Sequence, residues 1–306
     1  YAPAFKSQPK IKYTKPKGKV RGRSPVTAIA PLTDTHVGDV VHADQMLGLN
    51  SYDIDIFNRR LYGWAEQVLN LTNFQRTHTE VTHLVVPMLG DMISGDIHDE
   101  LARTNADNNL GQMIRGANLI AQALMSLAPH YEEIKVPCVV GNHGRMTRKI
   151  PAKDKYLDWD YMLYQWVASF CRNQKNIKFE IPKSFAHIFE AVNRKFLILH
   201  GDSISGSGSL VGLMNSAVKL RGVLQYRKGL EEEVTKLNID SAAPIGYDFD
   251  TVMMGHFHRV DEIDIGTGEM FICGTMKGGD EYALNRLHLI SKPKQIITWW
   301  HPKYGY

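Results

Sequence analysis

The chain has 306 residues, of which 43% are hydrophobic and 22% are charged, and its formal net charge is +4 at pH 7. This length and apolar content allow one large core or two modest ones, as in ordinary globular proteins. No apolar stretch approaches the roughly 20 residues that a transmembrane helix needs, so we expect no segment that spans a membrane.

The first 23 residues carry the positive charge of the chain, with eight basic residues and no acidic one. The rest of the chain has 28 basic and 32 acidic residues, and it is therefore weakly acidic. Because the first segment is also rich in proline and glycine and has no apolar period, it predicts an extended basic arm over residues 1–25. Such an arm either contacts the phosphates of DNA or RNA or serves only as a solubilising or packing tail.

From residue 26 onward, short apolar runs alternate with longer segments that have helical spacing. The runs predict buried strands at 26–32, 83–89, 136–140, 196–199 and 251–254. The longer segments predict helices at 57–74, 110–131, 157–173 and, singly or as a pair, 213–237. This alternation is typical of an α/β fold, and since no linker divides it, we expect one domain over residues 26–306.

The C-terminal part has a different pattern. Short alternating runs at 259–265, 270–276 and 295–301 are separated by turns that contain glycine. This pattern suits a second, mostly antiparallel sheet.

The three cysteines, Cys138, Cys171 and Cys273, are far apart in the sequence and form no CxxC pair. Their odd number and their spacing argue against both a disulfide framework and a thiolate zinc site. We therefore expect a protein of the reducing cytoplasm.

Each of the five predicted strands is followed by residues that can bind a metal ion. The motifs are TDTH (33–36), LGD (89–91), GNH (141–143), HGD (200–202) and GHFH (255–258). In α/β folds, ligand sites usually lie at the carboxyl ends of the strands. Side chains two residues apart in extended backbone point the same way, so each of the DxH and HxH pairs is expected to reach one site. The two oxygens of Asp91 suit a group that bridges two metal ions.

The ordered set DxH, GD, GNH, H and GHxH resembles that of the calcineurin-like metallophosphoesterase superfamily, across residues 34–258. The resemblance implies a four-layer fold, in which a two-sheet sandwich carries helices on both outer faces. It also implies a site for two divalent metal ions, for which manganese is the first choice and iron or zinc the alternatives. The implied ligands are Asp34, His36, Asp91 and His258 for one ion, and Asp91, Asn142, His200 and His256 for the other.

The resemblance also implies a catalytic role for His143, which would contact phosphate and protonate the leaving oxygen without binding metal. Gly144 stands where protein phosphatases of this superfamily have an acid, so the orientation of His143 must come from another group. We expect Asp96 to supply it. His98, beside Asp96, could also reach the site, although a helix start explains both residues equally well.

Three further residues could support the site from outside the set of ligands. Arg145 and Arg259 directly follow the GNH and GHFH motifs and could contact substrate phosphates, although surface charge explains them about as well. Asp202 could hydrogen-bond a ligand histidine.

The segments GDMISGD and GNHG differ from the GDxVDRG and GNHE of the Ser/Thr phosphatases in this superfamily, which argues against a protein phosphatase. Nucleases of double-strand-break repair share the motif set, and GNHGRMTRK resembles phosphoesterases carried by phages. We therefore expect a phosphodiesterase or nuclease that cleaves nucleic acid or nucleotides by attack of a metal-bound hydroxide. The alternatives are a small-molecule phosphomonoesterase, a cyclic-nucleotide phosphodiesterase, or a noncatalytic scaffold on the same fold.

Overall fold

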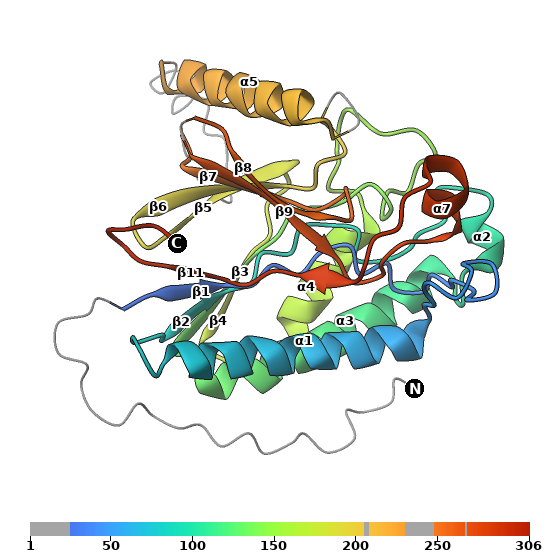
Figure 1. Cartoon of the computed structure of the whole chain (residues 1–306), viewed down its shortest axis with the longest axis horizontal. Coiled ribbons are helices and arrows are strands. Elements are labelled where there is room, and N and C mark those ends of the chain that lie inside the picture. Colours follow the sequence, from blue (N-terminus) through green and yellow to red (C-terminus); the bar gives the residue numbers. More distant parts are fainter. Residues whose placement is uncertain (1–24, 205–207, 230–247, 267) are drawn as a thin grey trace.

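In the computed structural model, which describes residues 25–204, 208–229, 248–266 and 268–306, two β-sheets pack face to face between layers of helices (Figure 1). The four-layer architecture expected from the motif order is therefore present. The basic arm expected over residues 1–25 lies, up to residue 24, outside the described residues.

The first sheet has the strand order β11-β1-β2-β3-β4. Strands β1 to β4 pair in parallel, and β11 pairs antiparallel with β1. Single bridges from Leu32 to Met88 and from Met88 to Cys138 continue the parallel pairing beyond the strands, toward the motifs. The strands are β1 (Thr27–Ile29), β2 (His83–Val85), β3 (Glu133–Pro137), β4 (Ile177–Glu180) and β11 (Thr298–Trp300).

The second sheet has the order β10-β9-β7-β6-β5, with β8 paired to β9. Strands β6, β7 and β9 are parallel, and β5, β8 and β10 are antiparallel to their neighbours. The strands are β5 (Ala186–Ala191), β6 (Arg194–Leu199), β7 (Thr251–Met254), β8 (Val260–Asp264), β9 (Glu269–Thr275) and β10 (Lys294–Gln295).

Helices α1, α3 and α4 cover the outer face of the first sheet, and α5 covers the outer face of the second (Figure 1). A side-chain oxygen at each helix start, from Asp53, Asn108 and Asp158, accepts a hydrogen bond from the first turn of α1, α3 and α4, respectively. The longer helices are α1 (Ile54–Gln75), α3 (Asn109–Leu127), α4 (Trp159–Phe170) and α5 (Leu210–Gly229), and the short ones are α2 (Leu101–Thr104), η1 (Ala128–His130) and α7 (Glu281–Leu287).

Three hydrophobic clusters lie between the sheets and the helices and hold the four layers together. The largest fills the space between α1, α3, α4 and the first sheet, and a smaller one lies between α5 and the second sheet. The middle cluster joins the two sheets and includes Ile29, Phe196, Phe271 and Trp300. Since alternate residues of a strand face opposite sides, each sheet contributes to two of the clusters, which explains why central strands such as β7 (TVMM) are apolar on both faces.

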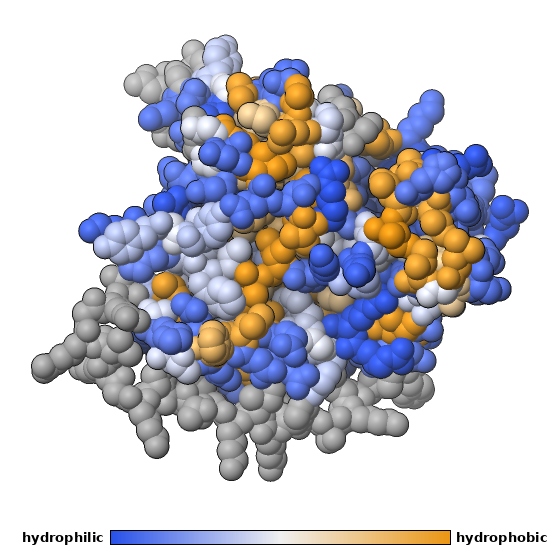
Figure 2. Space-filling model, viewed as in Figure 1, coloured by the Kyte–Doolittle hydropathy of each residue, from blue (hydrophilic) through white to orange (hydrophobic). Residues whose placement is uncertain are grey.

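None of the helices in the described part of the chain is long and apolar enough to cross a membrane. Figure 2 shows a surface on which polar residues surround smaller apolar areas, one of them around α7. Leu287, Leu289 and Ile290 are exposed there.

The five strands and the longer helices expected from the sequence are present, and the main differences concern strands. Strands β4 and β5 were not expected, because IKFE and AHIFEA are short and bear charged residues. The C-terminal strands do not form a sheet of their own. Strand β9 pairs in parallel with β7, and β11 crosses to the first sheet, where Trp300 is fully buried between the sheets. Of the helix expected over 213–237, residues 230–237 lie outside the described part.

Candidate metal centre

Side chains from five separate loops meet at the carboxyl ends of the strands. Three overlapping groups have ligand atoms within 4.8 Å of one another, namely Asp34, His36 and His258; His36, Asp91 and His143; and Asp91, His200 and His256. The groups share His36 and Asp91, so they form one continuous cluster. Asn142 joins it through its Oδ1, which lies 3.1 Å from Nε2 of His200. The structure thus brings together the seven residues that the sequence suggested as metal ligands, with His143 beside them.

The first part of the cluster is formed by Asp34, His36 and His258. Nε2 of His258 lies 3.0 Å from Nε2 of His36 and 3.1 Å from Oδ1 of Asp34. The other oxygen of Asp34 accepts the Thr33 hydroxyl at 2.6 Å, and the backbone N–H of His256 is shared by both oxygens, at 3.1 Å from each. These bonds fix the carboxylate so that Oδ1 faces the two rings, and three atoms with lone pairs converge on one point.

The second part is formed by Asp91, Asn142, His200 and His256. Nε2 of His200 lies 3.1 Å from Oδ2 of Asp91. Nδ1 of the same ring lies 2.7 Å from the Leu89 carbonyl oxygen. Since a carbonyl only accepts hydrogen bonds, Nδ1 carries the proton, which leaves Nε2 to face the cluster. The His256 ring packs edge-on against His200, with 5.1 Å between ring centroids.

The Asp91 carboxylate lies between the two parts, but its oxygens have different surroundings. Oδ1 accepts the backbone N–H groups of Asn142 and His143, both at 2.8 Å. Oδ2 lies 3.1 Å from His200 and 3.9 Å from His36, so this one oxygen faces both parts of the cluster. We expected both oxygens to serve a bridge; in the structure, Oδ1 instead holds the GNH loop in place.

The backbone at the ligands is not extended. Asp34, His36, Asp91, His256 and His258 all have positive φ, between 42° and 67°. The DxH and HxH pairs therefore reach one site through left-handed turns, and the explanation by extended backbone was wrong. Such conformations are rare for residues other than glycine and cluster at functional sites, where the surrounding structure enforces them.

Burial and charge set the ionisation of the cluster. Burial lowers the pKa of His36 well below its usual value and that of His256 to about 4, so both rings are neutral at physiological pH with a nitrogen lone pair free. Burial would raise the pKa of Asp91, but His200 and His143 hold it well below its usual range. Burial would likewise lower the pKa of His200, but the Asp91 carboxylate raises it to about 10. Asp91 thus keeps its charge in a buried place and attracts a cation.

This set of donors fits divalent metal ions. Carboxylate, amide oxygen and imidazole nitrogen are the ligands that manganese, iron and zinc share, and the described cluster contains no thiolate. The three cysteines are buried and free, and none of them belongs to the cluster. The coordination chemistry therefore agrees with the resemblance drawn from the motifs.

His143 is held beside the cluster by backbone contacts. Its Nδ1 lies 2.7 Å from the Ser94 carbonyl oxygen, and its ring centroid lies 4.6 Å from that of His36. Burial lowers the pKa of His143. The Ser94 carbonyl thus orients the ring, which is the role we had expected for Asp96. Asp96 is exposed, and so is His98, whose ring centroid lies 6.2 Å from that of His143.

The guanidinium groups considered for substrate binding are engaged elsewhere. Arg145 donates to the carbonyls of Asn142, Thr147 and Arg148 and so folds the loop that follows GNH. Arg259 pairs with Asp261 and donates to the Gly208 carbonyl.

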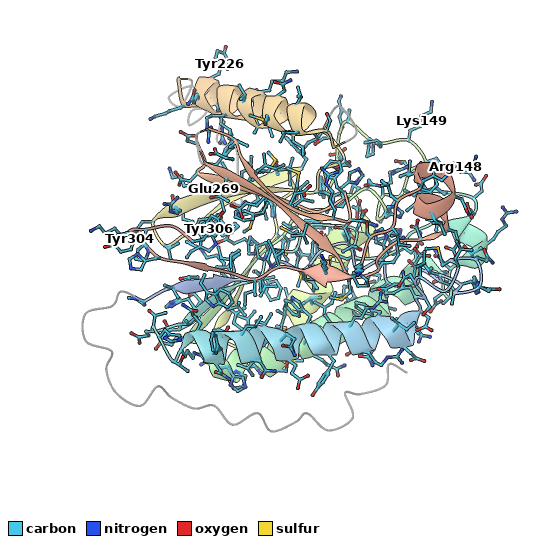
Figure 3. All side chains as sticks on the ribbon, viewed as in Figure 1. Arg148, Lys149, Tyr226, Glu269, Tyr304 and Tyr306 are labelled. Carbon is cyan, nitrogen blue, oxygen red and sulfur yellow. The ribbon has the colours of Figure 1, made fainter. Side chains whose placement is uncertain are left out.

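Farther along the GNH loop, Arg148 and Lys149 project into solvent (Figure 3). Arg148 pairs with Asp99 at 2.7 Å. Asp202 does not support a ligand histidine directly, because its carboxylate pairs with Lys155 at 2.8 Å and the Nδ1 of His200 is bonded to Leu89.

Two sets of buried ionisable residues beside the cluster were not found from the sequence. Asp160 is fully buried at the start of α4, and its two oxygens accept the backbone N–H groups of Met92 and Gly141, both at 3.0 Å. Lys277 is also buried and pairs with Asp39 at 2.8 Å and with Asp280 at 2.6 Å. The only sequence signal for either was a charged residue within a largely apolar segment.

Solved structures that superpose on this chain have low sequence identity to it. They include Vps29 from Entamoeba histolytica complexed with zinc, at 11% identity over 82% of this chain and 76% of that one, with a TM-score of 0.29. A novel archaeal phosphodiesterase is 14% identical over 81% of this chain and 84% of its own, with a TM-score of 0.32. Phosphopantetheinyl hydrolase from Mycobacterium tuberculosis is 11% identical over 89% and 96%, also with a TM-score of 0.32.

No protein-family model matches the sequence, and no curated protein matches it. The four layers and the order of the site residues along the chain resemble the calcineurin-like metallophosphoesterase superfamily.

Proposed function

We propose that this protein is a dinuclear metal-dependent phosphoesterase, and specifically a phosphodiesterase or nuclease that acts on nucleic acid or nucleotides. The observation that carries the proposal is the position of Asp91, whose Oδ2 faces His36 on one side and His200 on the other. A single carboxylate oxygen between two sets of imidazole and oxygen donors is suited to hold two neighbouring cations.

The residues that would hold one ion are Asp34, His36, Asp91 and His258, and those that would hold the other are Asp91, Asn142, His200 and His256. When bound, divalent ions of this kind activate a water molecule and neutralise charge on phosphoryl oxygens. The protein supplies the rigid frame, since the Leu89 carbonyl fixes the His200 ring and two backbone amides fix Asp91. Manganese is our first choice, and iron or zinc would also fit.

His143 would act on the leaving group. Its Nδ1 is occupied by the Ser94 carbonyl, so Nε2 is the nitrogen available to a substrate. Protonated at Nε2, the ring would donate to the leaving oxygen, a role that typically contributes about 10²- to 10⁴-fold to a rate. A His143→Ala variant should lose activity in that range while it keeps its metal, whereas His83→Ala, at an exposed histidine that begins β2, should match the wild type.

The decisive experiment compares diester and monoester hydrolysis. Purified protein with manganese is assayed on bis(p-nitrophenyl) phosphate and p-nitrophenyl phosphate, and then on single- and double-stranded DNA. We expect faster turnover of the diester and cleavage of at least one nucleic acid. Preference for the monoester would instead favour a phosphomonoesterase, and failure to hold manganese or to hydrolyse any of these substrates would favour a noncatalytic scaffold.

The basic arm supports a polyanionic substrate, because its eight basic residues are the excess positive charge of the chain. Deletion of residues 1–23 should weaken binding to DNA or RNA and flatten its dependence on salt, since counterion release scales with the phosphates that are contacted. Equal binding with and without the arm would reduce it to a packing tail.

A cytoplasmic location is also part of the proposal, supported by three cysteines that are all buried and unpaired.

A further inference from the structure

Two loops of the candidate metal centre are joined from behind by one buried carboxylate. Asp160 is fully buried, and its Oδ1 and Oδ2 accept the backbone N–H groups of Met92 and Gly141, both at 3.0 Å. Met92 directly follows Asp91, and Gly141 directly precedes Asn142. A side chain from α4 therefore fixes the spacing between the GD and GNH loops.

We propose that Asp160 is a positioning residue that aims the Asp91 carboxylate between the two sets of ligands. The inference rests on the proposed function, in that it assigns Asp91 to the metal centre. It adds a residue that lies outside the five motifs and whose carboxylate accepts backbone N–H groups beside the ligands.

The position of Asp91 depends on this second carboxylate because its own backbone is strained. Asp91 has a φ of 51° and follows Gly90, which has a φ of 91°, so the GD loop turns sharply and through uncommon conformations. The Asp91 side chain holds the GNH loop through its Oδ1, and Asp160 holds both loops through the next residue on each side. Without Asp160, two buried N–H groups would lose their acceptor, and the turn could relax away from the ligand geometry.

The rest of the α4 start is docked on the same loop. The Gly144 carbonyl accepts the Trp159 N–H at 2.8 Å, and a β-carbon on Gly144 would lie 2.1 Å from Oδ1 of Asp158. An acid at this position, as in GNHE, would therefore collide with α4. The capping bond of the helix is made by Asp158, which accepts the N–H of Asp160 at 2.8 Å. The Asp160 carboxylate is thus free of the capping role and serves the loops.

Asn176 offers a matched control at the amino ends of the strands of the first sheet, opposite the metal centre. Its Nδ2 donates to two backbone carbonyls, those of Ala128 at 2.8 Å and Tyr131 at 2.9 Å. Asp160→Asn places an amide N–H₂ against backbone donors, and Asn176→Asp places a carboxylate oxygen against backbone acceptors. Each change keeps the shape of the side chain and inverts one hydrogen-bonding group, and only the first lies behind the metal centre.

The test measures the affinity for Mn²⁺ by isothermal titration calorimetry, and stability by urea unfolding, in the wild type and both variants. We expect both variants to unfold at lower urea concentration. Asp160→Asn should weaken Mn²⁺ binding by about 10- to 100-fold, the usual cost of losing a group that orients a ligand. Asn176→Asp should leave the affinity within about twofold of the wild type, because loss of stability alone does not reach the ligands.

Wild-type affinity in Asp160→Asn, or an equal loss of affinity in both variants, would overturn the proposal. If Asp160→Asn does not fold, Asp160→Ser, which is smaller and keeps one acceptor, replaces it with the same expectation. Turnover is not used in this test. A wild type that binds Mn²⁺ but hydrolyses no ester would therefore contradict the proposed function alone. A wild type that binds no Mn²⁺ would contradict both the proposed function and the positioning role of Asp160.

Discussion

The two ends of the first sheet use similar polar side chains for opposite purposes. At the amino ends of its strands, Arg76 donates to the Val81 and His130 carbonyls, and Asn176 donates to those of Ala128 and Tyr131. These bonds satisfy backbone groups and close the fold. At the carboxyl ends, the loops of this sheet meet loops of the second sheet, and ligand atoms face one another across 3.0 to 3.9 Å, on loops with positive φ. A fold can keep such an unsatisfied cluster only because the surrounding groups hold it in place, as expected of a site built for a ligand.

The largest effect is expected from Asp91→Asn, which should abolish metal binding at the carboxyl ends of the strands while the fold is kept. In Asp91→Asn, the amide oxygen can still accept the Asn142 and His143 N–H groups, but an N–H₂ group replaces the oxygen that faces His36 and His200. Since an amide nitrogen does not bind a metal, Mn²⁺ binding and turnover should fall to background together. Calorimetry and the diester assay check this, with Asp248→Asn as control, since that carboxylate pairs with Arg221 away from the cluster. Full activity in Asp91→Asn would mean that the carboxyl ends of the strands are not arranged to bind metal ions.

The next largest effect is expected from Lys277, and it tests whether some charged residues at the carboxyl ends of the strands stabilise the fold without binding metal. The Lys277 ammonium is buried between Asp39 and Asp280. Burial would raise the pKa of Asp280, but the charge of Lys277 lowers this pKa to about 2. Lys277→Met would leave the Asp39 carboxylate buried without its cation, and it would leave Asp280, which is 22% exposed, with only the Ala283 N–H as partner in the described part of the chain. Breaking a buried pair in this way costs about 3–5 kcal/mol. Urea unfolding should show a loss of this size, and Asp39→Asn in the Lys277→Met background should recover part of it. A loss under about 1 kcal/mol would mean that the carboxylates reach water once Lys277 is gone.

A smaller effect follows from the cluster itself. If the carboxyl end is arranged for cations, Mn²⁺ should stabilise the folded protein by about 2.7 kcal/mol at a free concentration 100 times its Kd. Thermal unfolding with and without Mn²⁺ checks this as a rise in Tm. Asp91→Asn should show no rise, and Ca²⁺, which prefers sites composed of oxygen alone, should give a smaller one than Mn²⁺.

The contrast between the two ends also explains what could be predicted from the sequence. The ligands could be found because each follows an apolar run at the place where a strand approaches its end, and that pattern is local. Asp160 could not be found, because its role depends on α4 docking against two loops that precede it by 19 and 68 residues. The orientation of His143 was missed for a similar reason, since its partner is a backbone carbonyl, at Ser94, and any residue type provides one. The left-handed turns at the ligands had no signal either, because Asp and His adopt positive φ far less readily than glycine and so do not mark such turns in a sequence.

The smallest effect concerns an ion pair that lies away from the metal centre and contributes only to the stability of the fold. Glu180, at the end of β4, pairs with His187 of β5 at 2.7 Å and with Lys135 at 3.5 Å, so it joins the outer strands of the two sheets. Burial would raise its pKa, but these partners lower it below the usual 4.5. The stabilisation from a lowered carboxyl pKa is complete above that usual value and is lost as the pH falls through the lowered one. Glu180→Gln should therefore cost about 1 kcal/mol at pH 7 and progressively less below about pH 4. Urea unfolding of both proteins across this range checks the slope, and a cost that does not change with pH would mean that the bond to His187 depends on shape and not on charge.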